Sequence, residues 1–162
     1  MNNFTDFDFH EILGGASTYK FIPVTDVVSI PLPVNGIITD AITLVSGKQW
    51  FTGYASLGSL QLDESWEDTA AGRVNNVTIK GFYPDIDNSM LSILEEMLSY
   101  RYLVQVTDAM GKVRLGGSLT EPLIFNFARS TKAIPAERPG YEFQFSGKLK
   151  TSCYIYQEPT AS

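Results

Sequence analysis

The last third of the chain, residues 102–156, constrains the fold most because apolar and polar residues alternate there over several short runs. Within 123–127 and 141–145, every second residue is a phenylalanine, tyrosine or leucine. A period of two places successive side chains on opposite faces of a β-strand. Each run therefore predicts a strand with one apolar face. We expect a mainly β fold, a β-sandwich or barrel with one flanking amphipathic α-helix.

The helix is predicted over 88–101, where apolar residues recur at a spacing of three and four and so form one stripe. The residues of this stripe are Met90, Leu91, Leu94, Met97 and Leu98. Such a helix is expected to close one open end or face of the sheet.

Other segments are shorter and more interrupted. Residues 19–62 are rich in Val, Ile and Thr with Pro and Gly between them, which predicts short strands and bends. A strand is predicted at 76–83, a hairpin across 102–115, and a last strand at 152–156. The segment 63–72 carries four carboxylates around Trp66, which predicts an exposed loop.

The length of 162 residues suits one core. We expect an N-terminal arm at 1–18, a single β-rich domain at 19–158 and a short tail at 159–162. Cys153 is the only cysteine, so no internal disulfide forms, and its apolar surroundings predict a small core residue. Residues 1–15 are acidic, unlike a secretory signal, and no apolar run is long enough to span a bilayer. We expect a protein made in the cytoplasm, with no membrane partner.

The formal net charge is −6. Sequence-independent nucleic-acid binding requires an excess of Lys and Arg to neutralise phosphates, so the composition argues against it. An acidic wall is nevertheless compatible with a conduit, because like charge keeps nucleic acid from adhering.

Catalytic and metal motifs are weak. The N-terminal carboxylates and His10 offer metal-ligand chemistry, but their spacing matches no known site, and an arm docking Phe4, Phe7 and Phe9 on a neighbour explains the segment better. The acidic segment 63–68 lacks the alternation and glycine of an EF-hand, which favours a solvated surface. No GxSxG elbow and no phosphate-binding glycine motif is present. We therefore expect no enzymatic activity, no cofactor and no metal.

The segment 128–140 is long, carries several basic residues and two prolines, and has no periodicity. Loops of this length are uncommon inside compact domains unless they have a function. It could contact acidic surfaces such as 63–68 of another copy, or it could be an ordinary hairpin loop. The resulting subunit-interface candidates are Phe4, Phe7, Phe9, Trp66, Arg129, Lys132 and Arg138.

Four stretches carry a family resemblance: VRLGG at 113–117, EPLIF at 121–125, GYEFQFSG at 140–147 and YIY at 154–156. Together they resemble the end of small phage and prophage virion proteins, especially those of the tail-tube type. The likeness covers about a third of the chain, and residues 1–80 show no specific match. Tail-completion, terminator and other connector proteins have a similar size and style.

This resemblance implies a β-sandwich or barrel flanked by one helix and stacked as hexameric rings, with no catalytic residues. It predicts a structural virion subunit of a phage tail that assembles with copies of itself and with other tail or injection-apparatus proteins. DNA would pass through such an assembly without specific binding. The alternative is a monomeric carbohydrate- or ligand-binding β-sandwich that uses Trp50, Tyr54 and Trp66 as stacking surfaces.

Overall fold

The structure is a computed structural model that describes residues 16–56, 58–84, 89–107, 111–130, 139–157 and 159. It is mainly β with one α-helix, which confirms the predicted fold class. The strands are β1 (Ala16–Pro23), β2 (Val27–Ser29), β3 (Ile37–Ile38), β4 (Thr43–Leu44), β5 (Phe51–Ser56), β6 (Gln61–Thr69), β7 (Gly72–Pro84), β8 (Arg101–Thr107), β9 (Val113–Gly116), β10 (Leu123–Ser130), β11 (Gly140–Leu149) and β12 (Tyr154–Tyr156). The helix α1 spans Ser89–Met97.

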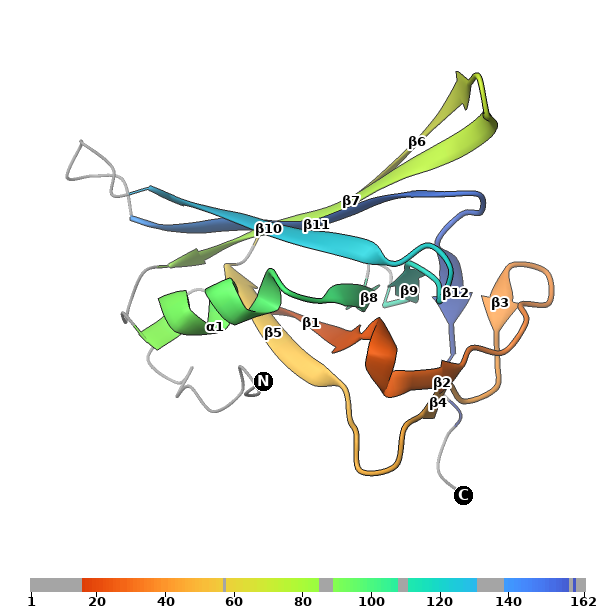
Figure 1. Ribbon diagram of the computed structural model, residues 1–162, viewed down its shortest axis with the longest axis horizontal. Helices are drawn as coiled ribbons and strands as arrows, with labels where there is room; N and C mark the ends of the chain where they lie inside the picture. Colours follow the sequence, from red (N-terminus) through yellow and green to blue (C-terminus); the bar gives the residue numbers. More distant parts are fainter. Residues whose placement is uncertain are drawn as a thin grey trace.

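Ten strands form one sheet in the order β3-β12-β9-β8-β10-β11-β7-β6, with β1 between β8 and β5. The sheet folds over itself. The antiparallel strands β10, β11, β7 and β6, here called the long ribbon, lie over a second layer that contains β5, β1, β8 and β9 (Figure 1). The layers join where β8 pairs with the start of β10, through Tyr102 opposite Leu123.

The main core fills the space between the two layers, and aromatic side chains dominate it. Phe125, Phe143 and Phe145 of the long ribbon are buried, while Glu142 and Gln144 between them are exposed. The predicted alternation in these two strands is therefore confirmed. Cys153 is buried at the margin of this core, as its sequence context predicted.

A smaller core lies on the outer side of the second layer. The segment 24–45 crosses that face and covers it with β2, β3 and β4. Ile38 and Ile42 from this segment pack with Leu103 and Leu115 of the sheet. Strands β2 and β3 are among the short strands predicted within 19–62. Pro31 and Pro33 lie outside the strands, as expected for residues that cannot donate a ladder hydrogen bond.

Gly53 leaves space for a core ring of the neighbouring strand. A Cβ on Gly53 of β5 would fall inside the ring of Tyr19 on the paired strand β1. That ring has no room to move, because its centroid lies 5.2 Å from that of Phe143. The glycine predicted to permit a bend therefore serves to seat an aromatic ring in the core.

The expected loop at 63–72 is wrong. Residues 61–69 form strand β6, which pairs with β7 over its whole length, from Gln61 opposite Lys80 to Thr69 opposite Gly72. The charges suggested a loop because they break hydrophobic alternation. An edge strand whose two faces are both solvated needs no such alternation.

The helix is shorter than predicted. It ends at Met97, and β8 begins at Arg101, whereas the periodic pattern extended to 101. Met90, Leu94 and Met97 of the predicted stripe are buried, but Leu98 follows the helix and is 43% exposed. At the N-terminal boundary, β1 begins at Ala16, so the last three residues of the predicted arm 1–18 belong to the sheet.

Candidate assembly surface

Strand β6 forms one lateral edge of the long ribbon. It pairs with β7 on one side, and no strand within the described ranges pairs with it on the other. Most of its side chains are exposed, including Trp66, of which 48% is accessible. An edge strand offers backbone N–H and C=O groups to any strand that comes alongside. The β6 edge is therefore a candidate assembly surface.

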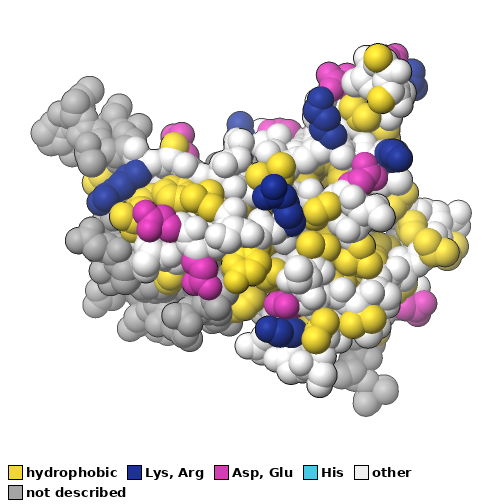
Figure 2. All heavy atoms as spheres, in the orientation of Figure 1, with side chains coloured by type: hydrophobic (Ala, Val, Ile, Leu, Met, Phe, Trp, Pro, Cys, Tyr) yellow, Lys and Arg dark blue, Asp and Glu magenta, His cyan; other side chains and the backbone are white. Residues whose placement is uncertain are grey.

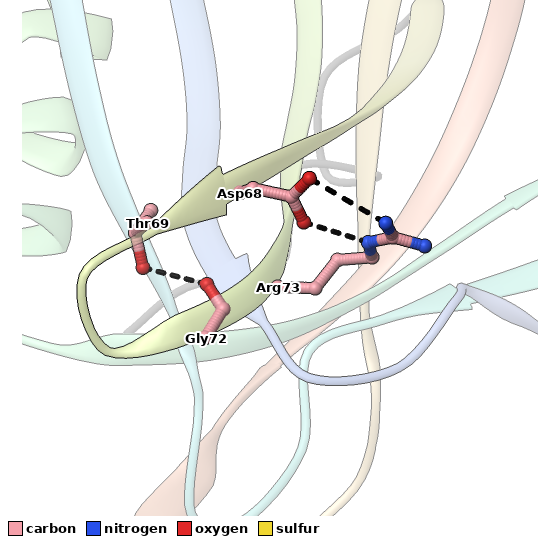
Figure 3. A network of polar contacts seen from close by, with 4 residues as sticks. All are labelled: Asp68, Thr69, Gly72 and Arg73. Carbon is pink, nitrogen blue, oxygen red and sulfur yellow. Dashed lines mark hydrogen bonds and ion pairs between the residues drawn. The ribbon is translucent and has the colours of Figure 1, made fainter.

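The hairpin of β6 and β7 projects beyond the rest of the ribbon, because β11 pairs with β7 only from Asn75 onward (Figure 1). At its tip the Thr69 hydroxyl donates to the Gly72 carbonyl at 2.7 Å, and Gly72 has a φ of 115°. Asp68 accepts hydrogen bonds from the Arg73 guanidinium, at 2.8 Å from Nε (Figure 3). Charged side chains of both signs gather on this projection (Figure 2).

The base of the projection is tied to the body by Glu64. Its Oε1 accepts from the Cys153 backbone N–H at 2.7 Å and from Asn75 Nδ2 at 2.8 Å. Asn75 Nδ2 also donates to the Thr151 carbonyl at 3.2 Å, and the Asn75 side chain is fully buried. One carboxylate thus joins β6, β7 and the connection between β11 and β12. Burial raises the pKa of the Cys153 thiol, and the nearby Glu64 carboxylate raises it further.

The opposite face of the hairpin is held by ion pairs between exposed side chains. Lys148 on β11 lies 3.4 Å from Glu67, and Lys80 on β7 lies 4.0 Å from Asp63. The pKa of Glu67 lies below its ordinary value because Asn76 hydrogen-bonds its carboxylate, and because Lys148 adds a hydrogen bond and a positive charge. These pairs fix the acidic side chains without burying them.

Strand β10 forms the other lateral edge of the long ribbon. It pairs with β11 along most of its length, but with β8 only at Leu123 and Ile124. No described strand runs along 125–130 on the side away from β11. Arg129 near its end is exposed, and its guanidinium lies 5.5 Å from the centroid of the Tyr141 ring.

The predicted interface residues fall into two groups. The structure places Trp66 on the β6 edge and Arg129 on the β10 strand, at opposite edges of the same ribbon. Within one copy these residues do not meet. Phe4, Phe7, Phe9, Lys132 and Arg138 lie outside the described residues.

The stacking residues of the carbohydrate alternative do not form one surface. Tyr54 is buried, with its ring packed edge-on against Tyr83 at 5.7 Å between centroids. Trp50 packs against the smaller core, whereas Trp66 lies on the projecting hairpin. Tyr54 therefore cannot present an exposed ring to a sugar.

No protein-family model, curated protein or solved structure matches this chain. Among the residues that the structure describes, no three His, Cys, Asp or Glu side chains cluster as metal ligands would. No helix in the same part of the chain is long and apolar enough to cross a membrane. Two edges of one ribbon, of different composition, remain the most distinctive feature of the surface.

Proposed function

We propose that this protein is a structural subunit of a phage tail, either a tail-tube protein or a tail connector, that assembles with copies of itself into rings or tubes. The observation that carries the proposal is that, among the described residues, β6 has no strand partner on its outer side and β10 has none there beyond Ile124. Pairing the β6 edge of one copy with the β10 edge of the next would continue the sheet from subunit to subunit. A head-to-tail contact of this kind generates a closed ring or an open helix, depending on the rotation per subunit.

The register of the ribbon supports closure into a barrel-like ring. The middle of β6, Ser65, lies opposite Asn76 of β7, whereas the middle of the unpaired stretch of β10 is level with residues 81–82 of β7. Pairing the two middles displaces the neighbour along the strands by five to six residues, or about 18 Å at 3.3 Å per residue. Four strands occupy roughly 19 Å across the ribbon. The ratio of these lengths gives a strand tilt of roughly 43°, which is within the range of closed β-barrels.

Charge also favours contact between unlike edges. Strand β6 carries Asp63, Glu64, Glu67 and Asp68 and no basic residue, whereas the only charged residue of β10 is Arg129. Two β6 edges brought together would place carboxylates opposite carboxylates, while β6 against β10 would not. Complementary charge of this kind selects partners and register more than it adds affinity. The function of such an assembly is mechanical, with a hexameric ring as the expected form and a net negative charge that keeps passing DNA from adhering.

The test blocks each edge separately. A proline whose missing N–H would have pointed outward prevents addition of a strand without breaking the β6–β7 ladder. Backbone N–H groups alternate in direction along a strand, so the N–H of either Ser65 or Trp66 points outward. Ser65→Pro and Trp66→Pro are both made, and the one that keeps the wild-type thermal midpoint marks the outward N–H. Arg129→Glu places a carboxylate on the β10 edge.

Light scattering and electron microscopy should show rings or tubes for the wild type and smaller species for each blocked variant. Because each blocked variant retains the other edge, mixing the two should give heterodimers and no rings. A wild-type protein that stays monomeric at high concentration would contradict the proposal, and one that also binds glycans would favour the alternative. Rings that persist in both blocked variants would show that assembly uses other surfaces.

A further inference from the structure

A small cavity of about 150 Å³ opens on the outer face of the second layer, beside the segment that covers the smaller core. Lys20 of β1 lies in register between Thr52 of β5 and Gln105 of β8, and all three side chains line the cavity. Thr107 and Val113 complete the wall with Tyr156, which comes from β12. The space would hold about five water molecules at roughly 30 Å³ each, or one short side chain.

Gln105 is unusual in its position. It is 7% exposed and sits in the middle of β8, where the residues on both sides of it, 102–104 and 106, are buried and apolar. No hydrogen bond to its side-chain amide comes from any described residue. The amide is not one of the fully buried side-chain atoms that lack a partner, so it keeps contact with the cavity space. The Gln105 amide is therefore a polar group that a ligand in the cavity can reach.

Lys20 adds a positive charge at the same place. It is exposed at the mouth, and no acidic side chain of the described residues lies within ion-pair distance of it. Lys ammonium groups are donors only, and a Gln amide and a Thr hydroxyl can each donate as well. The cavity thus gathers several donors and one unit of positive charge around a space the size of a side chain.

We infer that this cavity binds a carboxylate group carried on a short aliphatic chain. A carboxylate has one negative charge and lone pairs for about four hydrogen bonds, which matches Lys20 together with the Gln105 amide and the Thr107 hydroxyl. Val113 and the Tyr156 ring provide the apolar contact that the methylene groups of such a ligand need. The Tyr156 hydroxyl is held in place because it accepts from the Ile42 backbone N–H at 3.5 Å.

Two sources present this chemistry: an aspartate or glutamate side chain of another copy, such as those of the projecting β6 strand, and a free small carboxylate. The site does not depend on the proposed assembly, because a monomer would bind the free carboxylate equally well.

The experiment uses the full chain and propionate, which corresponds to the end of a glutamate side chain, with propionamide as its uncharged control. Two-dimensional NMR at constant ionic strength should show saturable shifts of the Gln105 side-chain NH₂ signals and of the amides of residues 20 and 113. Lys20→Met should weaken propionate binding by about tenfold to a hundredfold, because it removes a charge-assisted hydrogen bond. Lys150→Met, at an exposed lysine away from the cavity, should leave binding unchanged. Equal shifts with propionamide, no shifts, or full binding in Lys20→Met would overturn the inference.

Zero-length carbodiimide coupling then separates the two sources. A mixture of isotopically light and heavy protein is treated at high concentration, and cross-linked peptides are identified by mass. A mixed-isotope link between Lys20 and an acidic residue shows that another copy occupies the cavity. Propionate binding without such a link assigns the cavity to a free small carboxylate. Failure of ring assembly does not affect either reading of the propionate titration.

Discussion

Replacing Glu64 by alanine tests whether the projecting hairpin is anchored as the structure shows. The carboxylate accepts two hydrogen bonds, from the Cys153 N–H and from Asn75 Nδ2. Hydrogen bonds to a charged group contribute about 1.5–3 kcal/mol each, and a buried donor left without a partner costs about 1–3 kcal/mol. Because the Glu64 side chain is exposed to water, these contributions are reduced, and we expect a total loss of about 2–4 kcal/mol. For a chain of this length that corresponds to a decrease of roughly 4–16 °C in the thermal midpoint.

Asp68→Ala is the matched control on the same strand and the same face. Its ion pair with Arg73 has good geometry, at 2.8 Å, but the two side chains are 75% and 69% exposed. Exposed ion pairs contribute about 0–1 kcal/mol, so this variant should lose at most about 1 kcal/mol. The ion pair between Asp68 and Arg73 drawn in Figure 3 is thus expected to contribute less stability than the hydrogen bonds of Glu64.

Urea unfolding followed by circular dichroism measures both losses, under conditions where the protein is monomeric. Hydrogen exchange of the Cys153 amide gives the local readout, because that amide should exchange faster only in Glu64→Ala. Equal destabilisation by the two variants, or an unchanged Cys153 exchange rate, would refute the reasoning.

Two further predictions concern the core. Phe145 is fully buried, and the ring centroids of Phe125 and Tyr102 lie 5.0 and 5.5 Å from its own. Phe145→Ala should therefore lower the free energy of unfolding in urea by about 3–5 kcal/mol. The control Gln144→Ala, on the exposed face of the same strand, should change it by less than about 0.5 kcal/mol. Similar losses in the two variants would contradict the assigned faces of β11. The Cys153 thiol is buried and its pKa is raised, so it should not react with a disulfide reagent at pH 8 until urea unfolds the chain; rapid labelling of the folded protein would contradict its placement.

The strands with one face in the core could be predicted because burial imposes a period of two. Phe125 and Phe143 face inward as that period requires, and the exposed Gln144 lies between core residues. The helix could be predicted for the same reason, because burial of one helical face makes apolar residues recur at a spacing of three and four. Its end could not be placed, because Leu98 continues the spacing although it lies beyond the last helical turn.

Strand β6 could not be predicted because its cause lies in β7. The carboxylates of 63–68 give no strand signal, and only the ladder that runs from Gln61 to Thr69 makes this segment extended. The polar cavity was missed for a related reason. In the hairpin predicted across 102–115, Gln105 alternates with Val104 and Val106, a spacing typical of a solvent-facing residue, but the structure leaves only 7% of it exposed. Sequence spacing indicates a face and does not show what covers it.

The acidity of β6 has a consequence for how copies would pair. A long exposed edge strand invites association with any other edge, including its own counterpart in a second copy. The four carboxylates on β6 repel one another across a symmetric β6–β6 contact and so disfavour it. Ion pairs with Arg73, Lys80 and Lys148 reduce this repulsion. They do not remove it, because exposed ion pairs are weak. In the proposed assembly, the charges that make β6 resemble a loop in sequence are therefore what would direct the subunits toward a ring.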